Sequence, residues 1–214
     1  MPPAYSPGRY GPVREAAIFE ICAGAILTQN TAWSNVEKAL GGLFSAGIDS
    51  PARLAGCPLG RLARLIRPSG YYKQKSARLK EFFSRSIREH PEGLGKWFAA
   101  APAKDLRAEL LSYKGVGPET ADCMALYGGG KLSFVIDAYT RRAGERLGLE
   151  GGAGYAAWQE LFERNLPPDV KMYNEYHALL VRLGKDFCKK TKPLCGSCPL
   201  RRVCEKGRSW KSKT

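Results

Sequence analysis

The sequence predicts an all-α protein, because its apolar residues recur at helical spacing almost throughout and only one short stretch favours a strand. In the segment 13–29 the apolar side chains return every three or four residues, as Ile18, Ile21 and Ala25 illustrate, so this segment is predicted to be a buried helix. The strand-like stretch, 132–136, is solitary and too short to build a sheet.

Each further helix has a signal of its own. A second helix opens after Thr31 and carries Val36 and Leu40 on one face. Ser50 before Pro51 is an N-cap followed by proline at the first helical position. Pro58 begins a short helix that ends near residues 68–70. Helical periodicity also marks the segments 75–87, 105–113, 118–126, 138–147, 155–165 and 172–183.

The charge of the chain indicates a polyanionic partner. Lysine and arginine number 34 against 20 acidic residues, which gives a net charge of +14 and a pI near 9.6. No lipidation signal or basic helix with a bulky apolar face is evident, so nucleic acid is favoured over a membrane surface, and a charge that only aids solubility stays open. With no signal peptide evident, we expect a monomeric cytoplasmic protein of a bacterium or archaeon, associated with the nucleoid.

Four cysteines near the end of the chain have the spacing of a metal centre. They follow the pattern C-x6-C-x2-C-x5-C, and a reducing compartment favours metal binding over disulfides. One sulfur for each corner iron suits a [4Fe–4S] cluster, whereas structural zinc sites usually have two close pairs; zinc and redox-active thiols remain alternatives. Basic residues within the loops either contact phosphates or offset the negative charge of the cluster. The ligands are Cys188, Cys195, Cys198 and Cys204, and the basic residues include Lys189, Lys190 and Lys192.

A helix–turn–helix segment at 110–122 carries two glycines in its turn. Gly115 and Gly117 allow positive φ and a close approach of another chain, so the turn and the following helix suit a DNA phosphate. About twenty residues further on, Asp137 ends an apolar run. A lone aspartate at such a place is usually a helix N-cap.

The hairpin, the downstream aspartate and the cysteine spacing together resemble the endonuclease III branch of the helix-hairpin-helix DNA glycosylases. The resemblance covers residues 16–204. It implies a six-helix barrel domain at 22–131, with the helix-hairpin-helix at about 106–127. It also implies a cluster domain made of 1–21 plus 132–214, with the [4Fe–4S] loop at 188–204, and double-stranded DNA containing a damaged base as the partner.

The resemblance also implies roles for single residues. Asp137 resembles the catalytic carboxylate, which stabilises the positive charge that develops on the sugar and assists attack by water. Gln29 resembles the side chain that fills the gap left by an extruded base. Gly115, Val116 and Gly117 resemble the phosphate-binding hairpin, and Lys114 and Thr120 are further candidates for DNA binding.

One departure concerns strand cleavage. Bifunctional members carry a lysine two residues after the second glycine, where this chain has Glu119, which cannot form an imine. The Gly-Pro-Glu-Thr-Ala-Asp stretch at 117–122 and the Leu-Thr-Gln-Asn-Thr stretch at 27–31 resemble the monofunctional 3-methyladenine DNA glycosylase III subfamily more closely. The resemblance implies that Trp33 matches the pocket aromatic of that group. Tyr139 and Tyr10 are candidates for a second aromatic. Glu119 is explained either by the preference for acidic residues in the first turn of a helix or by a negative potential that attracts a cationic base.

These observations leave more than one function open. The favoured one is a monofunctional glycosylase of base excision repair that removes a flipped damaged base, with an alkylated base preferred among the damaged ones. A bifunctional glycosylase/AP lyase for oxidised or mismatched bases, with a relocated lysine, is the first alternative, and a non-catalytic DNA-binding module is the second. His177, one of two histidines, is interpreted as a helical packing residue.

Overall fold

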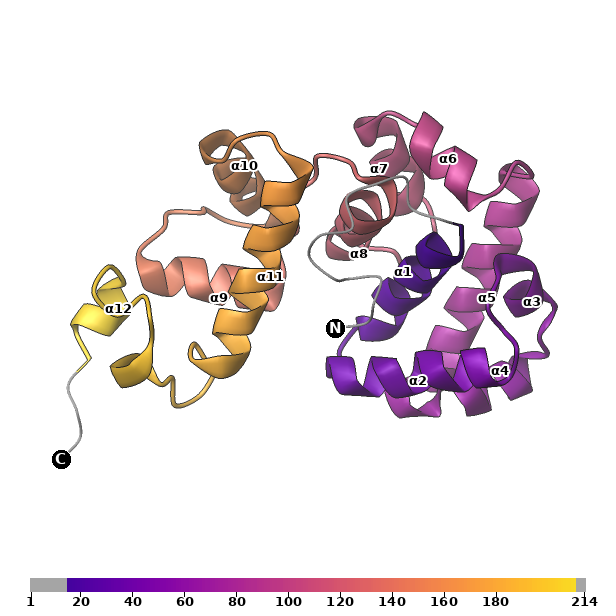
Figure 1. Cartoon of the computed structure of the whole chain (residues 1–214), viewed down its shortest axis with the longest axis horizontal. Helices are drawn as coiled ribbons and strands as arrows, with labels where there is room; N and C mark the ends of the chain where they lie inside the picture. Colours follow the sequence, from indigo (N-terminus) through magenta and orange to yellow (C-terminus); the bar gives the residue numbers. More distant parts are fainter. Residues whose placement is uncertain (1–14, 211–214) are drawn as a thin grey trace. The chain divides into compact units, whose positions relative to one another are not determined.

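The computed structural model of the chain describes residues 15–210, and their regular structure is entirely helical (Figure 1). This confirms the predicted fold class. The chain divides between Lys131 and Leu132 into two compact units, and each is treated by itself. None of the described helices combines the length and apolar character that a membrane crossing requires.

The first unit is built around α1, which runs through its centre (Figure 1). Residues on all sides of α1 are buried, among them Phe19, Cys22 and Ile26, as the sequence predicted for this segment. It packs against α2, α5, α6, α8 and η3. The elements of this unit are α1 (Glu15–Thr28), α2 (Trp33–Ser45), α3 (Pro51–Gly56), α4 (Leu59–Leu65), the 3-10 turn η2 (Arg67–Ser69), α5 (Tyr72–Glu89), α6 (Leu94–Ala100), α7 (Ala103–Leu111), α8 (Pro118–Cys123) and the π-helical turn η3 (Met124–Gly128).

Most predicted helices of the first unit are present, and Ser50 caps α3 as expected by accepting from the Arg53 N–H. The sequence did not predict α6. This helix is too short to show a clear period, yet it brings Trp97 and Phe98 into the core. The carboxylate of Glu15 accepts the N–H groups of its first residues, Leu94 at 3.1 Å among them, so α6 starts on a contact from a distant segment.

In the second unit α9 and α11 lie against each other. Gly184 makes this approach possible, because a Cβ atom there would lie 2.3 Å from Cδ1 of Tyr139. The elements are α9 (Ala138–Leu147), α10 (Tyr155–Asn165), α11 (Val170–Asp186), the 3-10 turn η4 (Cys195–Ser197) and α12 (Glu205–Arg208).

The strand-like stretch 132–136 forms no strand, as its solitary position suggested. Its backbone is held by side chains of α10 instead: the Phe134 N–H donates to Glu163 at 2.8 Å, and Gln159 donates to the Phe134 carbonyl at 2.9 Å. The Phe134 ring stacks on Phe162 at 4.5 Å between centroids. This buried segment fixes the position at which Asp137 begins α9.

The predicted assignment of residues 1–21 to the cluster domain stays a prediction. Residues 1–14 lie outside the described part of the chain, and residues 15–21 form the first half of α1.

Candidate active site and cysteine loop

The turn between α7 and α8 has one glycine in the left-handed region. Gly115 has φ +83°, whereas Gly117 has φ −94°, so the expectation of positive φ is met at the first glycine and is wrong at the second. Val116 lies between them with its side chain buried against the core, and its N–H donates to the Tyr113 carbonyl at 3.0 Å. The turn is thus anchored by its middle residue while Gly115 stays exposed.

An ion pair joins the two helices of the hairpin. Arg107 of α7 donates to both carboxylate oxygens of Asp122 on α8, at 2.7 and 3.2 Å. The Asp122 side chain is fully buried, so a charge at this place requires a partner. The bidentate contact ties α7 to α8.

Gln29, which follows the end of α1, lies on this hairpin. Its Nε2 donates to the Gly115 carbonyl at 2.9 Å and to Oγ1 of Thr120 at 3.2 Å. Its Oε1 accepts from Nη1 of Arg78 on α5 at 2.7 Å. The structure therefore brings three predicted DNA-binding residues together with Arg78. Arg78 could not be predicted from the sequence, because it is one of several basic residues on an amphipathic helix.

The predicted base-pocket residues belong to different units. Trp33 begins α2, and its indole packs on α1 near Gly24. Glu119 lies in the first turn of α8. Tyr139 is in the second unit, where it packs against Gly184, and the Arg142 guanidinium lies 5.0 Å from its ring centroid. Tyr10 lies outside the described residues, and Lys114 is exposed beside Gly115. The composition of the pocket stays a prediction.

Asp137 is the N-cap of α9, as its position suggested. Its Oδ1 accepts from the Thr140 N–H at 2.7 Å, and its Oδ2 lies 3.6 Å from Nε2 of His177 on α11. Burial acts to raise the pKa of Asp137, but the imidazole of His177 and the Thr140 amide outweigh it, so the pKa lies below its ordinary value. His177 is buried, as a packing residue would be, and it also faces the carboxylate, which its place in the sequence did not reveal.

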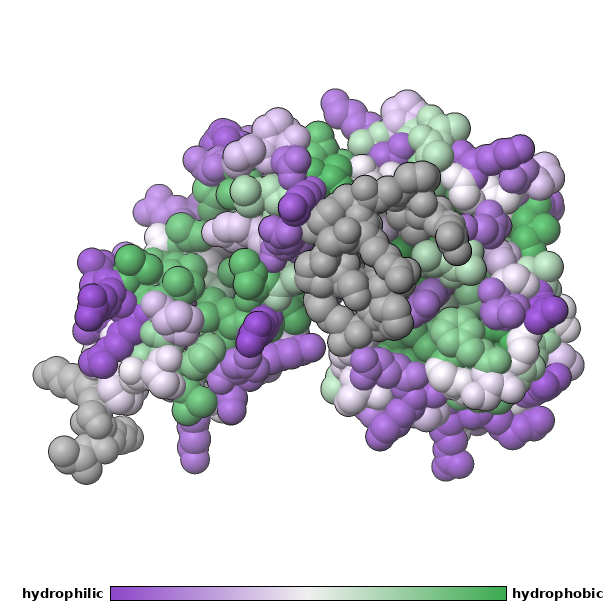
Figure 2. All heavy atoms as spheres, viewed as in Figure 1, coloured by the Kyte–Doolittle hydropathy of each residue, from purple (hydrophilic) through white to green (hydrophobic). Residues whose placement is uncertain are grey.

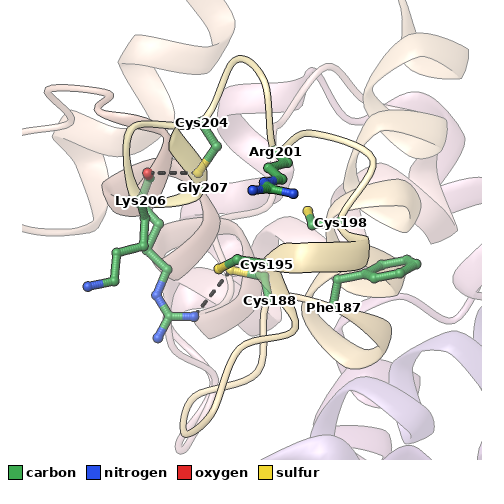
Figure 3. A pocket seen from close by; sticks show the side chains of 9 residues that line it. Phe187, Cys188, Cys195, Cys198, Arg201, Cys204, Lys206 and Gly207 are labelled. Atoms are coloured by element: carbon green, nitrogen blue, oxygen red, sulfur yellow. Dashed lines mark hydrogen bonds between the residues drawn. The ribbon is translucent and has the colours of Figure 1, made fainter. Parts of the chain in front are cut away.

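The four cysteines surround one small cavity (Figure 3). Cys188 follows α11, Cys195 and Cys198 lie at η4, and Cys204 precedes α12. Burial raises the pKa of the Cys198 thiol, and the other three cysteines are close enough to raise it further. Among the described residues, no three His, Cys, Asp or Glu side chains converge closely enough to hold a single metal ion.

Two arginines of α9 hold the cysteine loop. Arg142 donates to the Cys188 carbonyl at 2.7 Å. Arg146 donates to Sγ of Cys188 at 3.3 Å and to the carbonyls of Lys189 and Lys190 at 2.7 and 3.0 Å. Sγ of Cys204 donates back to the Arg146 carbonyl at 3.0 Å. The helix that Asp137 caps at one end is therefore bound to the cysteine loop at the other.

The basic residues of this loop are exposed. The side chains of Lys189, Lys190 and Lys192 all reach solvent, and Lys192 has a left-handed backbone with φ +51°. Figure 2 shows hydrophilic residues gathered around α12. A shallow depression there is lined by Arg201, Arg202 and Arg208.

Known proteins share this sequence and arrangement. Residues 23–168 match the family described as HhH-GPD superfamily base excision DNA repair protein. A Methanocaldococcus jannaschii protein named as a candidate DNA repair glycosylase is 42% identical over 87% of this chain and 84% of its own length. Endonuclease III of Thermotoga maritima is 31% identical over 90% of this chain and 84% of its own length.

Solved structures of DNA glycosylases share the fold of this chain. The 3-methyladenine DNA glycosylase of H. pylori, bound to 1,N6-ethenoadenine, superposes with a TM-score of 0.73 at 27% identity, over 86% of this chain and 89% of that chain. An endonuclease III in a non-covalent DNA complex reaches a TM-score of 0.75 at 23% identity, over 89% of this chain and 84% of that chain, which supports the fold alone.

Proposed function

The chain belongs to the HhH-GPD superfamily of base excision DNA repair proteins, and from this premise we propose that it is a monofunctional DNA glycosylase for an alkylated purine. The observation that carries the proposal is Glu119 in the first turn of α8. The resemblance puts the imine-forming lysine of bifunctional members at this position. A carboxylate cannot attack the sugar to form an imine, so the base is released by water instead.

Asp137 is the proposed catalytic residue. Cleavage of the N-glycosidic bond builds positive charge on the sugar, which a nearby carboxylate stabilises, and the same carboxylate can assist the attacking water. The lowered pKa of Asp137 keeps it ionised at neutral pH, as this role requires. An alkylated purine already carries a positive charge, so its departure needs little protonation. In the second unit, Thr140 and His177 hold the carboxylate.

Damaged double-stranded DNA is the proposed partner. The exposed Gly115 lets a DNA backbone approach the turn, which positions the enzyme without reading sequence. The exposed lysines of the cysteine loop, and a net charge of +14, add sequence-independent attraction to phosphates. We expect a monomer to act on this substrate and to receive the flipped base at Trp33 and Glu119 of the first unit.

The four cysteines are the proposed ligands of a [4Fe–4S] cluster. Their thiols line one cavity, and four sulfurs suit a group that needs one at each corner iron, whereas structural zinc sites usually have two close pairs of ligands. Such a cluster would supply a structural cross-link among η4, α12 and the end of α11. Arg146, beside Cys188, would offset part of its negative charge.

Similarity to the T. maritima endonuclease III favours a second candidate, a bifunctional glycosylase with AP lyase activity. Lys114 would then have to form the imine from the other side of the turn. Borohydride trapping on an oligonucleotide with an abasic site separates the two candidates, because only an imine is trapped. A covalent adduct that disappears in Lys114→Ala would establish the bifunctional candidate.

A panel of duplex oligonucleotides tests the proposed function directly. The duplexes carry 3-methyladenine, 7-methylguanine, uracil, thymine glycol or mismatched thymine and are analysed with and without alkali. We expect strand breaks at an alkylated purine only after alkali. Breaks without alkali, or activity restricted to thymine glycol, would overturn the proposal.

A further inference from the structure

We propose that Arg78 is a positioning residue that fixes the side chain of Gln29 on the hairpin, so that docking the hairpin on DNA also delivers Gln29 to the gap left by the flipped base. The inference rests on the proposed function for the role of Gln29. It goes beyond that function by assigning a task to a residue of α5.

Both ends of the Gln29 amide are used. Arg78 is a donor only, so the oxygen of the amide must face it, at 2.7 Å from Nη1. The amide nitrogen then faces the hairpin and donates to the Gly115 carbonyl and to Thr120. The Gly115 carbonyl accepts only, so it requires the same orientation of the amide from the other end. Without the guanidinium, the amide would be held at its nitrogen alone and its oxygen would lose its partner.

The Arg78 side chain also lies against the turn at Gly115. A Cβ atom at Gly115 would lie 2.6 Å from Nε and 2.7 Å from Cδ of Arg78. The guanidinium end therefore passes across the turn at Gly115, where a Cβ atom would displace it from its present position. The absence of a side chain at Gly115 thus permits both the left-handed backbone and the close approach of Arg78. Arg78, Gln29 and Gly115 are in mutual contact.

A second residue of α5 fixes the base of the same segment. Lys75, one turn before Arg78, is buried, and its Nζ donates to the carbonyls of Leu27 and Ser69 at 2.9 and 2.6 Å. Leu27 lies two residues before Gln29, at the end of α1. The backbone of this segment is held by Lys75 and its side chain by Arg78, both from one helix.

These contacts make Gln29 part of the hairpin before DNA arrives. The loss of rotamer freedom of a long side chain then occurs on folding and does not weaken DNA binding. The distance between the phosphate on the turn and the gap in the duplex is also set in advance. Arg78 should consequently matter for DNA with a gap to fill and little for intact duplex.

The test compares Arg78→Ala, Gln29→Ala and the double variant in the full-length protein. Fluorescence anisotropy measures affinity for a duplex with a tetrahydrofuran abasic-site analogue and for the matched undamaged duplex. We expect each single variant to lose about tenfold in the preference for the abasic duplex, the change expected for one charge-assisted hydrogen bond. The double variant should lose no more than Gln29→Ala, because the two residues act as one unit.

Lys73→Ala is the matched control, since it removes one exposed positive charge from the same helix. It should weaken both duplexes equally. Circular dichroism melting checks that each variant is folded. If Arg78→Ala is not folded, Arg78→Lys replaces it in the test, because it keeps the positive charge. Additive losses, or an Arg78→Ala effect equal on both duplexes with a salt slope reduced by about one, would show a plain phosphate contact and overturn the inference.

The binding measurement needs no base release. If the oligonucleotide panel shows no excision but the losses are non-additive, the proposed function fails and the Arg78 assignment stands. If excision occurs and the losses are additive, the Arg78 assignment fails alone.

Discussion

The hairpin region of the first unit and the cysteine loop of the second are held in different ways. The hairpin sits on a hydrophobic core and is closed by contacts among its own neighbours: Val116 is buried, Arg107 pairs with Asp122, and Gln29 bridges the turn. The cysteine loop has little regular structure, and Arg142 and Arg146 hold it chiefly through backbone carbonyls. The hairpin is thus held by packing on a core as well as by polar contacts, whereas the loop depends on a few polar contacts and on the group its thiols would bind.

The largest effect is expected for Asp137→Asn, which should reduce base release without reducing DNA affinity. Asp137→Asn keeps a side chain that can cap α9, but it removes the negative charge, so base release should fall by roughly 10²- to 10⁴-fold. DNA affinity should stay close to that of the natural protein. Single-turnover excision and anisotropy on the same duplex measure the two quantities. Excision at an unchanged rate would remove Asp137 from the mechanism.

Gly115→Ala is the reciprocal variant in the first unit. Alanine is strained at φ +83°, and its methyl group would displace the Arg78 side chain, so both the turn and the Arg78 contact to Gln29 are disturbed. Binding should weaken for every duplex, while the excision rate of bound substrate changes less than in Asp137→Asn.

A smaller effect is expected for the cysteine loop. Arg146→Gln removes a charged donor from Cys188 and from two carbonyls, and loss of a hydrogen bond to a charged group costs about 1.5–3 kcal/mol. Iron per chain, measured after timed exposure to a chelator, should fall faster than in the natural protein. Arg142→Gln is the control, because Arg142 contacts the Cys188 carbonyl and not its sulfur. Equal iron loss in the two variants would contradict a specific role of Arg146.

The same contrast explains what could be predicted from the sequence. Helices with a strong period, such as α1, were predicted because burial on several faces leaves a pattern in the residues themselves. The short α6 was not, because its start depends on Glu15, nearly eighty residues away. The capping role of Asp137 was predictable from local chemistry.

Arg78 and His177 show why the remaining site residues could not be predicted. Each lies on an amphipathic helix at a position that suits an ordinary surface or packing residue. Their tasks arise only when folding brings Arg78 to Gln29, 49 positions earlier in the chain, or His177 to Asp137. Charge and periodicity in one sequence carry no information about such distant pairs.

The smallest effect should appear in a pH profile. His177 helps to hold the pKa of Asp137 below its ordinary value, against the effect of burial. Asp137 is therefore ionised at neutral pH, and activity is lost only as the pH falls through its lowered pKa. In His177→Gln, burial remains and the imidazole is gone, so the acidic limb of the excision rate should move to higher pH with little change at neutral pH. His90, the other histidine of the sequence, lies in the first unit. His90→Gln should leave the acidic limb of the excision rate in place. An unmoved limb in His177→Gln would show that the imidazole only packs.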